Sequence, residues 1–207
     1  MEKAFFTPSG SKKMSTKDKI SVETFRLLHE TNEMNITINQ ICKAAGITKS
    51  TFYYYFHSVD EVIDSFSDII TSRLSELVPL IFQERTCIDQ ALMAIRLTDE
   101  WVERLGVAVA SSRYIMHLRK GDYPGFQVEA GWPMVVAILN KAIAVGELSG
   151  ERSAEEIAAS VFFIMRGINH TWCMQGGNFN FTEKVQEELR IYFDNLTSAK
   201  CELNNNC

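Results

Sequence analysis

Apolar residues recur every three or four positions along most of the chain, whereas strict alternation of apolar and polar residues is scarce. The first spacing is that of one face of an α-helix, and the second would indicate β-strands. The pattern therefore predicts an all-α protein of about nine helices. The expected helices span residues 16–29, 38–45, 48–56, 58–81, 88–105, 107–118, 132–145, 153–174 and 182–196.

Two short helices on either side of Gly46 have the most sharply marked ends. Thr37 and Gln40 fit a capping box, in which each side chain accepts a hydrogen bond from the backbone of the other residue. Gly46 can adopt the left-handed conformation that ends a helix, and Thr48 can cap the next one. Two short helices joined by a glycine-bearing turn are typical of a helix-turn-helix. The inner faces are expected to hold Ile41, Ala45, Phe52 and Phe56.

The outward face of the second short helix is rich in hydrogen-bonding side chains. An ordinary hairpin of an all-α core is the alternative, but a solvated helix without a partner usually carries Glu, Lys and Gln rather than three consecutive tyrosines. Hydroxyl groups donate to phosphate oxygens, and polar side chains at a helix N-terminus reach base edges in a major groove. The pattern therefore predicts that this helix binds DNA. The residues concerned are Thr48, Lys49, Ser50, Thr51, Tyr53, Tyr54, Tyr55 and His57.

Residues 38–62 resemble, without a gap, the signature of the tetracycline-repressor (TetR) family of transcription regulators. The resemblance implies an N-terminal three-helix DNA-binding domain followed by a C-terminal helical domain for ligand binding and dimerisation. Beyond residue 70 it covers only the architecture. The residues at matching positions are Ile41, Ala45, Gly46, Thr48, Thr51, Tyr53, Phe56 and Ser58.

The same resemblance assigns roles to individual side chains of the helix-turn-helix. Thr48, Lys49, Ser50 and Tyr53 would face bases or nearby phosphates, and Thr37, Thr51, Tyr54 and Tyr55 would contact the DNA backbone. Val59 departs from the family, which usually has a lysine there as a phosphate contact. Four lysines near the N-terminus could replace this cation, or could form an ordinary solvated surface. They are Lys12, Lys13, Lys17 and Lys19.

The charge distribution agrees with an N-terminal nucleic-acid interface. The whole chain has a net charge of −5, but residues 1–59 hold eight Lys and Arg against five Asp and Glu, which leaves +3 there and −8 in the remainder. Such asymmetry indicates that the N-terminal part meets a polyanion. We expect a flexible arm over residues 1–15, the DNA-binding domain over 16–60, the ligand-binding and dimerisation domain over 61–197, and a polar tail over 198–207.

The last two expected helices carry broad apolar stripes. A recognition helix covers few base pairs, and regulators of this kind generally bind palindromic sites as two-fold dimers. The stripes either pack inward within one subunit or form a four-helix interface between two subunits, which is the arrangement that the resemblance implies. The predicted interface residues are Ile157, Val161, Ile164, Ile168, Trp172, Val185, Leu189, Tyr192 and Leu196.

Aromatic and methionine side chains are frequent in the middle helices. At helical spacing such residues more often belong to a core than to a ligand site. Pockets between helices, however, are mostly apolar with a few polar groups, and the resemblance implies a small-molecule effector. The candidate pocket residues are Trp101, Tyr114, His117, Phe126, Trp132, Phe162, Met165 and Asn169.

Several other classes of protein are disfavoured. The chain shows no recognisable catalytic motif, so we do not expect an enzyme or a cofactor. Five scattered cysteines without a Cys-x-x-Cys pair indicate reduced thiols rather than disulfides or a metal site. Without a signal peptide or an apolar span, a cytoplasmic protein with no membrane association is expected.

These observations together predict a ligand-responsive transcriptional regulator that acts as a homodimer on a palindromic operator, with repression as the role the resemblance implies. The alternative is a helix-turn-helix adaptor that acts through a protein partner with weak or no DNA binding, to which the loss of a cation at Val59 would point.

Overall fold

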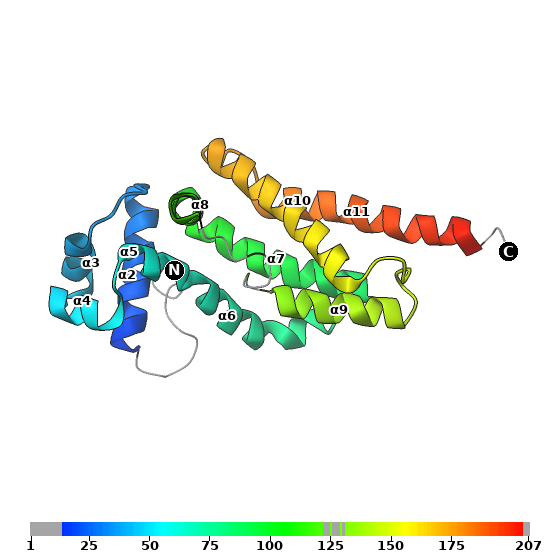
Figure 1. The fold of residues 1–207 in the computed structure, drawn as a ribbon, viewed down its shortest axis with the longest axis horizontal. Coiled ribbons are helices and arrows are strands. Elements are labelled where there is room, and N and C mark those ends of the chain that lie inside the picture. The colour runs from blue at the N-terminus through cyan, green and yellow to red at the C-terminus, as the bar shows by residue number, and fades with distance from the viewer. Residues whose placement is uncertain (1–13, 122–124, 126–128, 130, 205–207) are drawn as a thin grey trace. The chain divides into compact units, whose positions relative to one another are not determined.

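The computed structural model describes residues 14–121, 125, 129 and 131–204 (Figure 1). Every regular element in these residues is an α-helix, so the predicted all-α fold is confirmed. There are ten of them where about nine were expected. They are α2 (Thr16–Thr31), α3 (Ile38–Ala45), α4 (Lys49–Tyr55), α5 (Val59–Asp64), α6 (Phe66–Ile81), α7 (Cys87–Leu105), α8 (Val107–Lys120), α9 (Trp132–Ala144), α10 (Ala154–Met174) and α11 (Phe181–Asn204).

The extra helix arises from a break inside the segment expected to be one helix over residues 58–81. The Ser65 hydroxyl donates to the carbonyl of Val62 over 2.6 Å, and the chain starts a new helix at Phe66. Serine side chains compete in this way with the regular backbone hydrogen bonds of a helix. The prediction of a single helix was therefore wrong. At the other end of the chain, α11 continues two turns beyond the predicted end at Leu196, because polar residues without Gly or Pro do not stop a helix.

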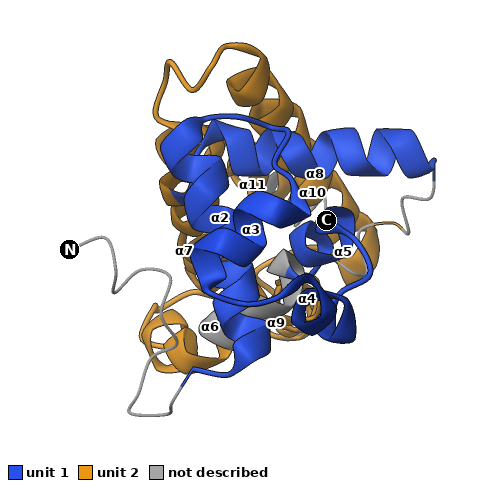
Figure 2. Cartoon of the chain, turned by 90° about the vertical axis from the view of Figure 1, so that its left-hand side faces the viewer, with its two compact units in different colours: residues 1–66, 105–123 blue, residues 67–104, 124–207 orange. Residues whose placement is uncertain are grey.

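The chain divides into two compact units (Figure 2). Unit 1 comprises residues 1–66 and 105–123, and unit 2 comprises residues 67–104 and 124–207. In unit 1, α2 packs against α3, α5 and α8. Its inner face buries Ile20, Thr24 and Leu28, each with no exposed surface. Helix α8 thus packs with α2 and α5, the helices on either side of the helix-turn-helix. The functional division at residue 60 stays a prediction.

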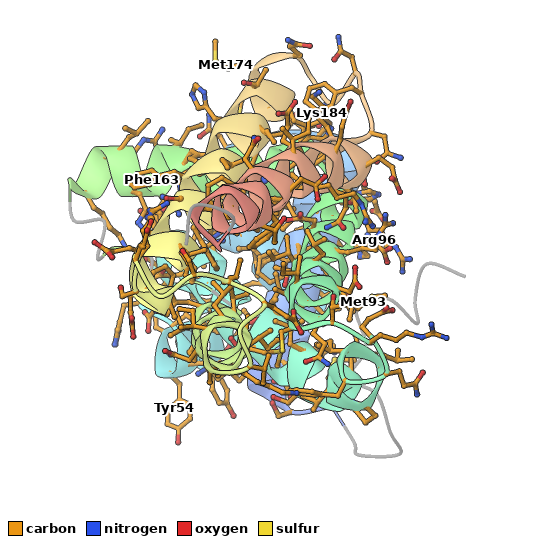
Figure 3. All side chains as sticks on the ribbon, turned by 90° about the vertical axis from the view of Figure 1, so that its right-hand side faces the viewer. Tyr54, Met93, Arg96, Phe163, Met174 and Lys184 are labelled. Carbon is orange, nitrogen blue, oxygen red and sulfur yellow. The ribbon has the colours of Figure 1, made fainter. Side chains whose placement is uncertain are left out.

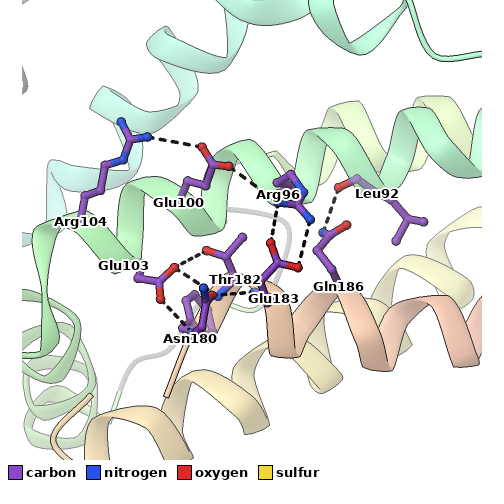
Figure 4. Close-up of polar contacts among 10 residues, drawn as sticks. Leu92, Arg96, Glu100, Glu103, Arg104, Asn180, Thr182, Glu183 and Gln186 are labelled. Atoms are coloured by element: carbon purple, nitrogen blue, oxygen red, sulfur yellow. Dashed lines mark hydrogen bonds and ion pairs between the residues drawn. The ribbon is translucent and has the colours of Figure 1, made fainter. Parts of the chain in front are cut away.

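In unit 2, α10 packs along both α9 and α11 (Figure 1). In two helices of this unit, the first backbone N–H groups donate to carboxylates from distant parts of the sequence. Glu147 accepts hydrogen bonds from the backbone N–H groups of Cys87 and Ile88 at the start of α7, the shortest over 2.7 Å. Glu103 accepts from the N–H groups of Phe181 and Thr182 and from the Thr182 hydroxyl at the start of α11 (Figure 4).

The described part of the chain contains no helix with the length and apolar character needed to cross a membrane. Of its cysteines, Cys42, Cys87 and Cys173 are free thiols, while the side chains of Cys201 and Cys207 lie outside the described residues.

Candidate DNA-binding interface

The helix-turn-helix of unit 1 has the local geometry that the sequence predicts. Thr37 caps α3, and its hydroxyl accepts from the N–H of Gln40 while its own N–H donates to the Gln40 side chain over 2.8 Å. Gly46 ends α3 with a φ of 63°, in the left-handed region that favours glycine. The turn is followed by Thr48, whose hydroxyl caps α4 by accepting a hydrogen bond from the N–H of Thr51.

Helix α4 has one buried face and one exposed face. Phe52 has no exposed surface, and Phe56, which ends the helix, is only 2 % exposed. Between them Tyr53 is 48 % exposed and Tyr54 is 81 % exposed, and Tyr54 points away from the ribbon (Figure 3). The two phenylalanines therefore fix the orientation of α4, and the tyrosines project from it.

Three hydroxyl groups gather at the N-terminus of α4. The Oγ1 atom of Thr48 lies 2.8 Å from Oγ of Ser50 and 2.9 Å from Oγ1 of Thr51. Each hydroxyl can both donate and accept, so this cluster can turn its protons toward an anionic oxygen without leaving its own acceptors unpaired. Lys49, in the middle of the cluster, is exposed as well. The arrangement presents donors and one cation at the end of α4.

The corner between α4 and α5 is capped differently from the start of α3. Ser58 does accept from the N–H of Glu61, but the Glu61 carboxylate accepts from the N–H of His57 rather than from that of Ser58. His57 is exposed and Val59 is half-buried. The predicted DNA contacts are thus brought together on α4 and its two flanking turns, except for Thr37, which caps α3. Among them only Thr51 and Tyr55 are half-buried, and the others are exposed.

The residues predicted for a subunit interface fall into two groups. Five are buried within unit 2 of a single chain, so they belong to its core and do not reach a partner directly. These are Ile157, Val161, Trp172, Val185 and Leu189. The other four are half-buried and remain available to a partner. These are Ile164, Ile168, Tyr192 and Leu196.

Large apolar side chains that the sequence reasoning missed lie on the outer face of α10 and α11. Phe163 is 66 % exposed, Met174 75 % and Ile191 53 %, and Figure 3 shows the first two at the surface. Between the two helices runs an open groove of about 790 Å³, with Gly167, Ile168 and Lys184 among the residues that line it. Helical periodicity contained this signal, because positions 163, 167 and 174 lie opposite the buried stripe of α10.

The residues predicted for an effector pocket are only partly brought together. Trp132 and Phe162 are buried in unit 2, with ring centroids 5.3 Å apart in an edge-to-face arrangement. Trp101, Met165 and Asn169 are half-buried in the same unit. Tyr114 and His117 belong to unit 1. Phe126 lies outside the described residues.

Comparison with known proteins finds a family model that matches the helix-turn-helix region of unit 1. Residues 22–65 match the model of the bacterial regulatory proteins of the tetR family. No curated protein matches the chain.

Solved structures with the same fold cover nearly the whole chain. A putative TetR-family transcriptional regulator from Rhodococcus sp. superposes with a TM-score of 0.66 at 15 % identity, over 88 % of this chain and 98 % of that one. Thermus thermophilus FadR, a TetR-family transcriptional repressor in complex with lauroyl-CoA, also gives a TM-score of 0.66, at 18 % identity over 84 % of this chain and 92 % of that one. The fatty acid degradation regulator FadR from Bacillus halodurans gives 0.63 at 14 % identity, over 86 % and 96 %. The chain therefore carries the N-terminal DNA-binding domain of the TetR family and has the fold of that family's transcriptional regulators.

Proposed function

We propose that this chain is a ligand-responsive transcriptional repressor that binds a palindromic operator as a homodimer through α4. The observation that carries the proposal is the two-sided character of α4. Phe52 and Phe56 hold this short helix against unit 1, and the tyrosines and hydroxyl groups between and before them face solvent. Two exposed tyrosines and a half-buried third within seven residues of helix indicate a surface that meets a partner.

The exposed groups match the chemistry of a DNA duplex. Tyr53 offers a hydroxyl and a half-exposed aromatic ring beside the buried Phe52, and Lys49 offers a cation at the start of the helix. Hydroxyl donors bind phosphate oxygens, and polar side chains near the first turn of a recognition helix reach base edges. Thr37, Thr51, Tyr54 and Tyr55 are proposed as contacts to the DNA backbone.

The experiment is to select bound fragments from genomic DNA and to measure their affinity for wild-type protein and for Tyr53→Ala. We expect the substitution to weaken operator binding by about 1–3 kcal/mol. Phe82→Ala is a matched control, because Phe82 is an aromatic residue of unit 2 with nearly the same exposure, 50 %. A folded wild-type protein that selects no fragment would refute the proposal and would favour the adaptor alternative.

For the homodimer we propose the outer face of α10 and α11 as the interface. Exposed Phe163, Met174 and Ile191 lie on the two helices that line the groove containing Gly167. An apolar surface of this kind on two long helices favours packing against a second copy. A Cβ added to Gly167 meets no atom within 4 Å, so a larger side chain fits the single chain there. Gly167→Arg is expected to leave the monomer folded and to shift the molar mass in light scattering from dimer to monomer. Leu118→Arg, at an 82 % exposed site of unit 1, is the control and should remain dimeric.

For the effector we propose a small molecule bound in unit 2 next to the Trp132 and Phe162 rings. Their edge-to-face pair supplies an apolar wall, and half-buried Trp101, Met165 and Asn169 supply further candidates for contact. Lauroyl-CoA is the first probe, because a TetR-family repressor of similar fold was solved with it. Binding of the effector should favour a spacing of the two α4 helices that no longer fits the operator, and so should lower DNA affinity.

A further inference from the structure

Two lysines in the first turn of α2 place their ammonium groups at the two ends of α4. The Nζ atom of Lys17 lies 5.5 Å from the ring centroid of Phe56, the residue that ends α4. The Nζ atom of Lys19 lies 3.9 Å from the position that a Cβ would take on Gly46, in the turn that leads into α4. Both lysines are exposed.

The position of this first turn is fixed by contacts on either side of it. Ser15 and Asp18 form a capping box that starts α2, and Ile20 and Thr24 are buried one and two turns later. Side chains two positions apart on a helix do not face each other. Lys17 and Lys19 therefore leave α2 in different directions, which is why they reach opposite ends of α4 rather than one point.

Neither ammonium is neutralised within the part of the chain that the structure describes. No carboxylate forms an ion pair with Lys17 or Lys19 there, and the neighbouring Asp18 is engaged by Ser15. The ring beside Lys17 attracts a cation without removing its charge. Both charges are therefore available to an anion outside the protein.

The corner next to Lys17 is where the TetR resemblance expects a cation and this sequence has none. Val59 is the first residue of α5, three positions after Phe56, and it is a neutral side chain where the family usually has lysine. The Lys17 ammonium lies beside the Phe56 ring, on a different helix. The chain thus has a cation next to the end of α4 although position 59 is neutral.

We propose that Lys17 and Lys19 form a phosphate clamp on duplex DNA, in which each ammonium binds a backbone phosphate at one edge of the major groove that α4 enters. The seven residues of α4 span about 10 Å at 1.5 Å per residue, so the two ammonium groups lie on either side of a short helix. Lys17 supplies the phosphate contact that Val59 lacks. The clamp rests on the proposed DNA-binding function and adds to it the residues that hold the backbone.

The test uses a labelled duplex of roughly 30 base pairs with mixed sequence, because phosphate contacts dominate non-specific binding and require no known operator. Affinity is measured by fluorescence anisotropy from about 50 to about 300 mM NaCl for wild type, Lys17→Met and Lys19→Met. Each phosphate contact contributes about 0.9 to the slope of log K against log salt, so each variant should lose about that much slope and bind about five-fold more weakly near 150 mM.

Three further variants separate charge from structure. Lys141→Met is the matched control, because Lys141 also lies over an aromatic ring, 5.9 Å from the centroid of Phe82, but in unit 2. It should leave the slope unchanged. Lys17→Arg keeps the cation and should keep the slope. Val59→Lys in the Lys17→Met background should restore it, since it returns a cation to the turn that follows Phe56.

The possible results are distinct. A wild-type slope in both Lys17→Met and Lys19→Met, with wild-type protein binding the duplex normally, would overturn the clamp and leave the proposed DNA-binding function intact. Failure of Val59→Lys to restore the slope would overturn the claim that Lys17 replaces the missing cation. A wild-type protein that binds no duplex at any salt concentration would overturn both the clamp and the proposed function.

Discussion

The helices of the two units begin in different ways. In unit 1, the N-termini of α2, α3, α4 and α5 are each capped by a serine or threonine that accepts the N–H three residues ahead. In unit 2, α7 and α11 have local caps too, but carboxylates from 60 and 78 residues away also accept their first N–H groups. The orphan donors at the starts of α2–α5 are satisfied by near neighbours alone, and those of α7 and α11 by near and remote groups together. Helix α10 of unit 2 begins with a local capping box, like α2 and α3.

This difference explains what each unit can do with its surface. A local cap at Thr48 fixes the start of α4 without a contact from a distant part of the chain. The exposed side chains of α4 can therefore be substituted without changing how the helix begins. In unit 2, Glu103 and Glu147 tie the starts of long helices to distant segments (Figure 4). A change in the packing of unit 2 must therefore move or break these hydrogen bonds.

The largest effect is expected from removing a remote cap. Glu103→Ala leaves the N–H groups of Phe181 and Thr182 and the Thr182 hydroxyl without their acceptor, and both residues are nearly buried. A hydrogen bond to a charged group contributes about 1.5–3 kcal/mol, and the free energy of unfolding in urea should fall by at least that amount.

Glu100→Ala is the control for this loss. Glu100 lies one turn before Glu103 on α7 and makes only surface ion pairs, 4.0 Å from Arg96 and 3.7 Å from Arg104 (Figure 4). Exposed pairs of this kind contribute less than about 1 kcal/mol. Equal losses in the two variants would show that the remote cap is no stronger than a surface charge.

The next effect concerns Asp99, which is buried on α7 with one carboxylate oxygen lacking any hydrogen-bond partner. Burial, and then the nearby charge of Glu103, raise the pKa of Asp99 well above its usual value, while Arg96 lowers it to a smaller extent. The folded protein thus holds a proton that the unfolded chain releases, so stability falls as the pH rises from the unfolded pKa toward the folded one.

Asp99→Asn removes this titration. We expect the variant to melt a few degrees above wild type near pH 8, by about 3 °C for 1 kcal/mol in a chain of this length, and the gain to shrink toward pH 4. Thermal unfolding across that pH range measures it. A gain that is constant with pH would mean that the Asp99 carboxyl does not titrate between these limits.

The same contrast explains how far the sequence predicts the structure. The capping box at Thr37 and Gln40, the turn at Gly46 and the buried faces at Phe52 and Phe56 were all predicted, because each depends on residues a few positions apart. The family model covers this same region. Interactions between residues close in sequence are therefore sufficient to predict most of the backbone geometry of the candidate DNA interface.

What the sequence did not predict depends on distant partners. No pattern in the sequence pairs Glu103 with Phe181, and none indicates that α8 packs against α2. The buried residues Val185 and Leu189 were assigned to a subunit interface because periodicity identifies an apolar stripe but not the surface that covers it. The lysines of α2 were candidates by charge alone, and only the fold brings Lys17 to Phe56.

A local cap should matter less than a remote one. Thr48→Val keeps the shape of the side chain but removes the hydroxyl that accepts from the N–H of Thr51, which should cost about 1 kcal/mol of folding free energy. The variant should also weaken DNA binding, because the cluster with Ser50 loses its central hydroxyl. Thr197→Val, where the hydroxyl only donates to the carbonyl of Asp194 in α11, is the control and should change neither measurement appreciably.

The smallest effect is expected from a substitution of Gly167, in the middle of α10. It should have opposite signs on the stability of the monomer and on the affinity between subunits. A Cβ at this position meets nothing in the single chain, so Gly167→Ala should stabilise the monomer by up to about 1 kcal/mol through helix propensity alone. In a dimer closed over the groove of α10 and α11, the added methyl group separates the two helices and weakens association. Melting at low protein concentration should therefore rise while the dimer dissociation constant, measured by sedimentation, also rises. A gain in melting temperature without any change in association would place the partner on another face, because only a facing helix can convert one exposed methyl group into a loss of affinity.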